Sequence, residues 1–193
     1  MNLIRIFEYI GLGGFILWAV LERSFSFSGQ QQSKGQKQAQ GSYWLINMGW
    51  YGAMIFSIVD TLGLKWMGFR TPLWVLRGLG TALTLSGIMI RFMARKALGK
   101  QYSVHVETSE AHKLVTVGIY TMVRHPAYLG LICLFLGIPL SMGNWGGLAI
   151  AVAGGIPAVV YRILIEEKSL GEWFGEQYEQ YKKGTWRLIP YLW

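Results

Sequence analysis

The sequence predicts an all-α integral membrane protein with about five transmembrane helices, and three observations carry this prediction. Hydrophobic residues make up 52% of the 193-residue chain and charged residues only 15%, below the roughly 25% of a soluble domain. The apolar residues gather into runs close to the ~20 residues that a helix needs to cross a bilayer. The basic residues, which give a net charge of +8, stand between these runs, and this favours contact with anionic lipid over binding of nucleic acid.

The first half of the chain contains three apolar runs, which predict spans at 3–21, 43–64 and 72–90. Arg5 and Glu8 lie inside the first run and no small-residue cleavage site follows it, so we expect a retained span rather than a cleaved signal peptide. The Gln-rich segment 22–41 predicts a flexible loop. We expect Asp60, near the end of the second run, to lie at the membrane interface rather than to be buried.

The second half contains an apolar run, 126–161, that carries no charged residue. As a single helix this run would extend about 54 Å, nearly twice the thickness of the hydrocarbon layer, so it must fold back. The residues that favour the break are Pro139, Ser141, Gly143 and Asn144. They predict two helices, 127–140 and 145–165. Apolar residues at every third or fourth position then predict an amphipathic helix through Leu170, Phe174, Tyr178 and Tyr181.

The distribution of basic residues predicts the orientation in the membrane. Five spans place 22–42, 91–124 and the C-terminal tail on one side, with fourteen of the eighteen Lys and Arg residues. An excess of positive charge marks the cytoplasmic side. We therefore expect the N-terminus outside, and both large polar segments and the C-terminus in the cytoplasm.

Basic and aromatic side chains gather at the start of the predicted helix 127–140. Pro126 suits the first turn of a helix, and the free N–H groups and the dipole of that helix end favour an anion. Arg124, His125 and Tyr128 stand within about one turn of it, so the spot suits a carboxylate or a phosphate. The same residues also fit an ordinary helix start with an interfacial Tyr and a snorkelling Arg, and the residues alone leave both interpretations open.

Two adjacent carboxylates, Glu166 and Glu167, follow the last long apolar run. At the C-terminus of a helix they would oppose the helix dipole, and a charge at the membrane edge is costly. Local stability therefore does not explain them, and we expect them to bind an ammonium group or ribose hydroxyls. Together with the anion site they fit a zwitterionic cofactor such as S-adenosylmethionine. One cysteine, Cys133, and three histidines leave little material for a metal centre.

These residues also carry a family resemblance. The stretch H-x-L-V-T-x-G-x-Y-x-x-x-R-H-P-x-Y-x-G at 112–130 is followed by E-E-K-S-L at 166–170, F-G at 174–175 and R-L-I-P at 187–190. Over about 98–193 the chain resembles the isoprenylcysteine carboxyl methyltransferases, as a compact prokaryotic-type member. The R-H-P-x-Y-x-G element alone also resembles motifs of phospholipid N-methyltransferases and of membrane sterol reductases, so its pairing with the later motifs is the more specific signal.

The resemblance implies a membrane enzyme that transfers a methyl group from S-adenosylmethionine to the carboxylate of a prenylcysteine-like substrate, leaving S-adenosylhomocysteine. It implies a three-helix membrane region at 1–97 and a methyltransferase core at 98–193. The cofactor pocket would face the cytoplasm, formed by the 91–128 linker, the last helical hairpin and the C-terminal tail. A lipophilic small-molecule or prenylated substrate would enter from the membrane, so membrane lipid is the other expected partner.

By position, the resemblance implies which residues hold each part of the cofactor. His125 and Tyr128 would hold the methionine carboxylate, and Glu167, with Glu166, would hold the ammonium or the ribose. The backbone that would line the adenosine is that of Lys113, Leu114, Val115, Gly118 and Tyr120.

Arg124 and Arg187 are the candidates for binding the acceptor carboxylate, because a guanidinium group can bind a carboxylate through two hydrogen bonds. With Glu167 they are the expected catalytic residues. A carboxylate acceptor is already ionised at pH 7. Its methylation therefore needs alignment and exclusion of water rather than a strong general base.

Three other functions remain open on the residues alone. A phospholipid or amine N-methyltransferase would need a base near the amine, such as a Glu. An NADPH-dependent membrane reductase would need basic residues for the extra phosphate of its cofactor. A small non-enzymatic membrane subunit would have no affinity for any of these cofactors.

Overall fold

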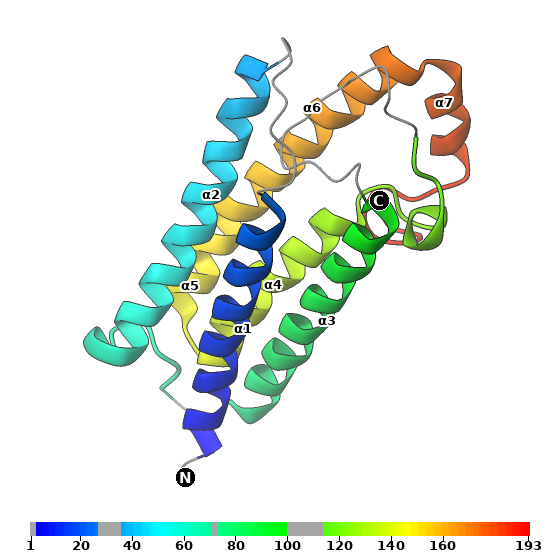
Figure 1. The fold of residues 1–193 in the computed structure, drawn as a ribbon. Helices are drawn as coiled ribbons and strands as arrows, with labels where there is room; N and C mark the ends of the chain where they lie inside the picture. The colour runs from blue at the N-terminus through cyan, green and yellow to red at the C-terminus, as the bar shows by residue number, and fades with distance from the viewer. Residues whose placement is uncertain (1–2, 27–35, 71–72, 100–113) are drawn as a thin grey trace.

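The computed structural model describes residues 3–26, 36–70, 73–99 and 114–193, and it has no β-strand within these ranges. Its elements are α1 (Leu3–Ser26), α2 (Gln36–Val59), the π-helical turn η1 (Asp60–Leu64), α3 (Trp74–Leu98), the 3₁₀ turn η3 (Gly118–Thr121), α4 (Pro126–Met142), α5 (Trp145–Ile150), the π-helical turn η4 (Ala151–Gly155), α6 (Ile156–Phe174) and α7 (Glu176–Lys183). The long helices run side by side, and α7 lies with the C-terminal segment at one end of the bundle (Figure 1). The predicted all-α class is confirmed.

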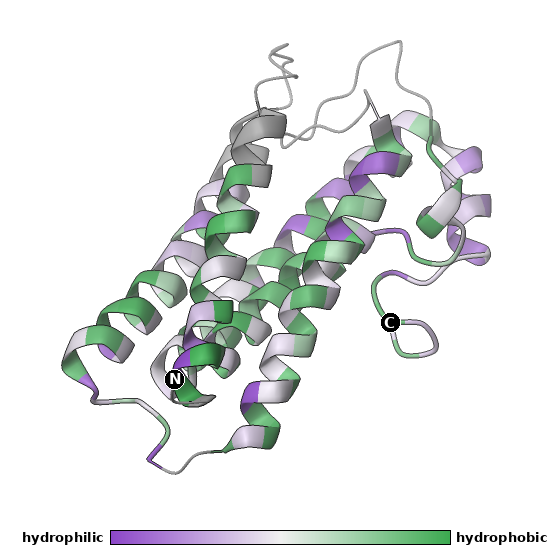
Figure 2. Cartoon of the chain, turned by 60° about the horizontal axis from the view of Figure 1, so that its bottom comes forward, coloured by the Kyte–Doolittle hydropathy of each residue, from purple (hydrophilic) through white to green (hydrophobic). Residues whose placement is uncertain are grey.

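Three helical stretches in the described part of the chain are long and apolar enough to cross a membrane: Gly41–Leu64, Trp74–Leu98 and Trp145–Phe174. The apolar helix α4, with 17 residues, is shorter. Large apolar side chains such as Val75 and Met89 are mostly exposed on the outside of α3. Hydrophobic residues cover much of the length of the helices, as Figure 2 shows. Such an outer surface suits hydrocarbon and indicates an integral membrane protein.

The first two helices extend further than the sequence pattern predicts. α1 continues to Ser26, and α2 begins at Gln36 rather than at 43. The added first turns of α2 read Gln-Lys-Gln-Ala-Gln, and Ala, Gln and Lys all have high helix propensity. The predicted loop 22–41 is therefore shorter than expected, and its middle, 27–35, lies outside the described residues.

Small residues let α3 and α4 pack with their backbones in close approach. A Cβ atom on Gly87 would stand 2.7 Å from the Gly130 carbonyl oxygen, and one on Gly137 would stand 2.6 Å from the Thr84 nitrogen. Both distances are too short for any side chain, so only glycine fits. Close backbone contact of this kind is how helices gain dispersion energy in a membrane, where burial of apolar area gives little.

An aromatic cluster fills the middle of the bundle. The rings of Trp18 on α1 and Trp50 on α2 have centroids 4.3 Å apart, and Trp50 meets Phe135 of α4 edge-on at 5.0 Å. Trp50 and Phe135 are almost completely buried. The cluster joins α1 and α2 to α4, which carries part of the candidate site described below.

The apolar run 126–161 folds back, as predicted. Of the four residues expected to break the helix, only Gly143 and Asn144 lie at the break. Gly143 ends α4 in the left-handed conformation, with φ +71°. Asn144 then caps α5, because its side-chain oxygen accepts a hydrogen bond of 2.7 Å from the Gly147 N–H. Pro139 and Ser141, expected to help break the helix, both lie inside α4.

The expectation that Asp60 is not buried is wrong, because its side chain is fully buried in η1, directly after α2. Its carboxylate accepts hydrogen bonds from the backbone N–H groups of Trp66 (2.8 Å) and Met67 (3.1 Å) and from the Asn144 side chain (2.7 Å). One carboxylate thus ties the loop after α2 to the α4–α5 turn, at the end of the bundle away from α7 (Figure 1).

We expect Asp60→Ala to lower the free energy of unfolding by about 2–4 kcal/mol, because it leaves three donors without an acceptor. Thermal unfolding in detergent measures the effect. Asp60→Asn, which keeps one side-chain oxygen, serves as the matched control and should lose less. An unchanged melting temperature in Asp60→Ala would show that the carboxylate does not hold this end of the bundle.

Candidate functional site

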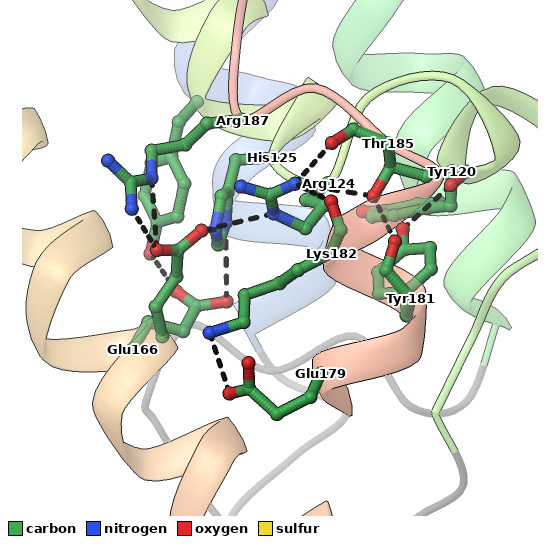
Figure 3. A network of polar contacts seen from close by, with 11 residues as sticks. Tyr120, Arg124, His125, Glu166, Glu179, Tyr181, Lys182, Thr185 and Arg187 are labelled. Atoms are coloured by element: carbon green, nitrogen blue, oxygen red, sulfur yellow. Dashed lines mark hydrogen bonds and ion pairs between the residues drawn. The ribbon is translucent and has the colours of Figure 1, made fainter. Parts of the chain in front are cut away.

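Polar side chains converge at the end of the bundle where α6 meets the C-terminal segment (Figure 3). They come from the start of α4, from the middle of α6, from α7 and from residues 184–193. The expectation that Glu166 and Glu167 close a helix is wrong, since α6 continues to Phe174. The pair therefore does not oppose a helix dipole, and it is held instead by side chains from other elements.

The predicted amphipathic helix is two helices. Gly175, with φ +53° and ψ −126°, ends α6 and begins α7, and such a conformation suits only glycine. After this break α7 runs toward the C-terminal segment (Figure 1), and its residue Tyr178 is buried with Tyr181 and Lys182 as neighbours.

Glu167 is bound from three directions. Its Oε1 accepts from Arg124 Nε at 3.1 Å and lies 3.3 Å from His125 Nε2. Its Oε2 accepts from Arg187 Nε at 2.9 Å and from Arg187 Nη2 at 2.6 Å. The Glu167 side chain is 10% exposed, so this carboxylate is nearly enclosed by two guanidinium groups and an imidazole.

Arg124 also fixes the C-terminal segment. Its Nη1 donates to the Lys182 carbonyl at 3.2 Å and to the Thr185 carbonyl. Its backbone N–H donates to the Trp186 carbonyl at 2.8 Å, next to a His125 N–H bond of 3.1 Å to the Arg187 carbonyl. Arg124 is thus occupied within the protein and its side chain is 9% exposed.

Arg187 is the more accessible of the two candidate arginines. Its side chain is 26% exposed, and its guanidinium carbon lies 4.9 Å from the centre of the Trp193 ring. The guanidinium group therefore sits between an indole face and the Glu167 carboxylate.

A second set of contacts runs deeper into the bundle. Tyr128 donates to Glu166 Oε2 at 2.7 Å, and its hydroxyl also accepts from Arg162 Nε at 3.3 Å. Arg162 Nη1 donates to Ser42 on α2 at 2.9 Å. Glu166, with a side chain 27% exposed, is the more accessible of the two carboxylates.

Sequence reasoning did not single out Arg162 or Arg91. Arg162 is 2% exposed on α6, one turn before Glu166. Arg91 is 8% exposed on α3, and its Nη1 donates to the Ala127 carbonyl at 2.9 Å, at the start of α4. Their positions in the sequence could have indicated them, because each arginine directly follows an apolar run, and a charged residue within a membrane helix is rare unless it has a function or a partner.

The predicted adenosine segment lies against α7. Tyr120 is buried, and its carbonyl accepts from the Tyr181 hydroxyl at 2.7 Å. Burial raises the pKa of Tyr181 to about 12, although the nearby Arg124 acts in the opposite direction. Gly118 begins the turn η3 with φ +62°.

The other residues predicted to line the adenosine precede the turn η3. Leu114 and Val115 lead into η3 without a secondary structure of their own. Lys113 lies outside the described residues. In the described ranges there is also no group of three or more His, Cys, Asp or Glu side chains that could hold a metal ion.

The cluster offers complementary charges within a small space. Arg124, Arg187 and His125 surround one carboxylate, while Glu166 presents a second carboxylate that is partly accessible. Such a set suits a ligand that bears both a negative and a positive group. It can bind and orient the ligand, and the apolar helices below it can exclude water.

Known proteins share these segments. The sequence model of the phospholipid methyltransferase family matches residues 75–177. Protein-S-isoprenylcysteine O-methyltransferase B of Arabidopsis thaliana is 27% identical over 158 residues, which cover 77% of this chain and 77% of that protein. Protein-S-isoprenylcysteine O-methyltransferase of Schizosaccharomyces pombe is 35% identical over 109 residues, which cover 55% of this chain and 46% of that protein.

A solved structure has the same fold over most of the chain. It is a eukaryotic intramembrane Ras methyltransferase, isoprenylcysteine carboxyl methyltransferase, with 25% sequence identity and a TM-score of 0.59. The similarity covers 76% of this chain and 52% of that one, so the chain spans about half the length of that enzyme. The resemblance to isoprenylcysteine carboxyl methyltransferases is confirmed. Since the family match runs from α3 into α7, across more than half of the chain, the chain belongs to the phospholipid methyltransferase family.

Proposed function

We propose that the protein is an integral membrane methyltransferase that uses S-adenosylmethionine to methylate the carboxylate of a prenylcysteine-like lipophilic substrate. The observation that carries the proposal is the polar cluster around Glu166 and Glu167, which lies at the end of an apolar bundle. The names of the similar proteins support the same chemistry.

The side chains of the cluster fit S-adenosylmethionine by charge. The carboxylate of the methionine part would lie near His125 and Tyr128, at the positive end of α4. The ammonium would lie near Glu166, whose side chain is the more exposed of the two carboxylates. The adenosine would lie along Leu114, Val115, Gly118 and Tyr120, together with Lys113. When bound, the cofactor supplies a methyl group on a positively charged sulfur.

Glu167 would act mainly through its neighbours. Because Arg124, Arg187 and His125 already occupy its two oxygens, we propose that it fixes these three groups and adds its charge to the ammonium or ribose side of the pocket. Arg124, which is bound to the C-terminal segment as well, would then be a positioning residue.

Two arginines are candidates for binding the acceptor carboxylate. Arg187 is partly exposed, as the sequence-based proposal requires. Arg162 is buried one turn before Glu166, within the stretch Trp145–Phe174 that is apolar enough to cross a membrane. Since the acceptor is tethered to a tail that prefers the bilayer, we favour Arg162 for this contact. The carboxylate is already ionised, so these residues need only align its oxygen with the methyl carbon.

The membrane arrangement extends this proposal. We propose that α1 to α4 and the continuous stretch α5–η4–α6 cross the membrane, which makes five spans. The excess of Lys and Arg on the side of the site would place the pocket and the C-terminus in the cytoplasm and the N-terminus outside. The core at 98–193 would carry the chemistry. The N-terminal region 1–97 would supply membrane packing and polar contacts to the core, among them those of Ser42 with Arg162 and of Arg91 with the Ala127 carbonyl.

A phospholipid or amine N-methyltransferase is the second candidate. The family model carries the name of phospholipid methyltransferases, and Glu166 is exposed enough to accept a proton from an amine. Activity on amine headgroups without activity on prenylcysteine analogues would favour this candidate.

We expect S-adenosylmethionine and S-adenosylhomocysteine to bind the detergent-purified protein with micromolar affinity, because the charge pattern of the cluster matches both. Isothermal titration calorimetry measures this, with NADPH as the comparison ligand. Binding of NADPH alone would contradict the proposal and would favour a membrane reductase.

We expect Glu166→Gln to weaken binding of S-adenosylhomocysteine by about 10- to 100-fold, because a charged hydrogen bond to the ammonium is lost. Glu179→Gln is the matched control, since Glu179 is 59% exposed on α7 and pairs with Lys182. Calorimetry compares the two variants. Equal affinities would show that Glu166 does not contact the ammonium.

We expect Arg162→Lys to lower kcat/KM for a prenylcysteine analogue at least tenfold, because a lysine cannot bind a carboxylate through two parallel hydrogen bonds. The affinity for S-adenosylhomocysteine should change less than threefold. Arg187→Lys is the comparison in the same assay. A larger loss in Arg187→Lys than in Arg162→Lys would assign the acceptor to Arg187 instead.

A further inference from the structure

The Tyr178 side chain is buried beside Tyr181 and Lys182 of the polar cluster, and its hydroxyl has no hydrogen-bond partner in the part of the chain that the structure describes. Tyr178 is 1% exposed, and its hydroxyl oxygen forms no hydrogen bond with any of the described residues. An unpaired buried hydroxyl is unfavourable, and native proteins rarely leave one without a role. Because the hydroxyl is closed off from solvent, its partner has to be a group that is enclosed with it.

The ring of Tyr178 is held in place by its neighbours. Its centroid lies 6.2 Å from that of the Tyr181 ring, and the Lys182 ammonium lies 5.6 Å from its centre. α7 begins at Glu176, so the Tyr178 side chain projects from the first turn of a short helix. The hydroxyl is therefore positioned by packing rather than by a hydrogen bond of its own.

The charges around the hydroxyl make it a donor. Burial and the neighbouring Glu167 carboxylate both raise the pKa of Tyr178 above its usual value, so the phenol keeps its proton at physiological pH. A protonated phenol in this position can donate a hydrogen bond to an uncharged oxygen or nitrogen. An ammonium has no lone pair to accept it, and the methionine carboxylate is already assigned to His125 and Tyr128 at the start of α4.

The next turn of α7 indicates which part of a ligand lies there. Tyr181, three residues further, donates to the Tyr120 carbonyl, so α7 packs against the turn η3. We propose that the Tyr178 hydroxyl donates a hydrogen bond to the nucleoside part of the cofactor, at a ribose hydroxyl or an adenine nitrogen. This inference rests on the proposed function, which puts the adenosine along the same turn, and it adds a binding residue on α7 to that pocket.

The test is Tyr178→Phe, which removes only the hydroxyl. The readouts are the melting temperature without ligand and the affinities for S-adenosylhomocysteine and for 5′-methylthioadenosine, which keeps the nucleoside but lacks the amino-acid end. We expect the melting temperature to stay level or rise, since an unpaired polar group is removed. We expect both affinities to fall by the same factor, roughly five- to tenfold.

Two further variants serve as matched controls. Tyr181→Phe removes a hydroxyl that is already bonded to the Tyr120 carbonyl, so its melting temperature should fall. Tyr51→Phe changes a tyrosine that is 45% exposed on α2, and both readouts should match the wild type.

The outcomes that would overturn the inference differ from one another. Unchanged affinities in Tyr178→Phe would show that the hydroxyl does not contact the ligand, and a lowered melting temperature with them would show that it is bonded within the protein. Loss of affinity for S-adenosylhomocysteine alone would move the contact to the amino-acid end. If the wild-type protein binds neither ligand, the proposed function itself fails.

Discussion

The Glu167 carboxylate joins three parts of the chain that are far apart in sequence. It is bound by Arg124 and His125, which precede α4, and by Arg187 in the C-terminal segment, while it stands on α6 itself. The two guanidinium groups, of Arg124 and Arg187, would repel one another without it. Removing one member of such a nearly buried set leaves an uncompensated charge, which costs about 3–5 kcal/mol. The relative positions of α4, α6 and the C-terminal segment therefore depend on this one side chain.

Backbone hydrogen bonds also join the C-terminal segment to the residues before α4. The N–H groups of Arg124 and His125 donate to the Trp186 and Arg187 carbonyls, and the Trp186 N–H donates to the Met122 carbonyl. These bonds bring the C-terminal segment alongside the residues before α4, so that Arg187 can reach Glu167. The ionic contacts and the backbone bonds are mutually supportive, and together they build a polar layer at the end of an otherwise apolar bundle.

Residues close in sequence were predicted well, and contacts across the bundle were not. The fold-back near Gly143 follows from chain length alone, and Arg124, His125 and Tyr128 share one helix start by their spacing. The contact between Arg162 and Ser42 joins residues 120 positions apart, and no periodicity reveals such a pairing. The burial of Asp60 was not predicted, because it depends on three hydrogen-bond donors that lie later in the chain, at Trp66, Met67 and Asn144. The helix end expected at Glu167 was wrong because partners on other elements stabilise the two carboxylates within α6.

The hydrogen bond from Arg162 to Ser42 links α2 to the polar cluster around Glu166 and Glu167. Apart from it and the α3 residue Arg91, the described polar contacts of the cluster all come from residues after 113. α1 also meets α3 through the ion pair of Glu8 with Arg77, and both α1 and α2 meet α4 through the apolar cluster of Trp18, Trp50 and Phe135. A substitution on the apolar faces of α1 and α2 therefore leaves the contacts around Glu166 and Glu167 in place, whereas a change at Ser42 reaches that polar layer directly through Arg162.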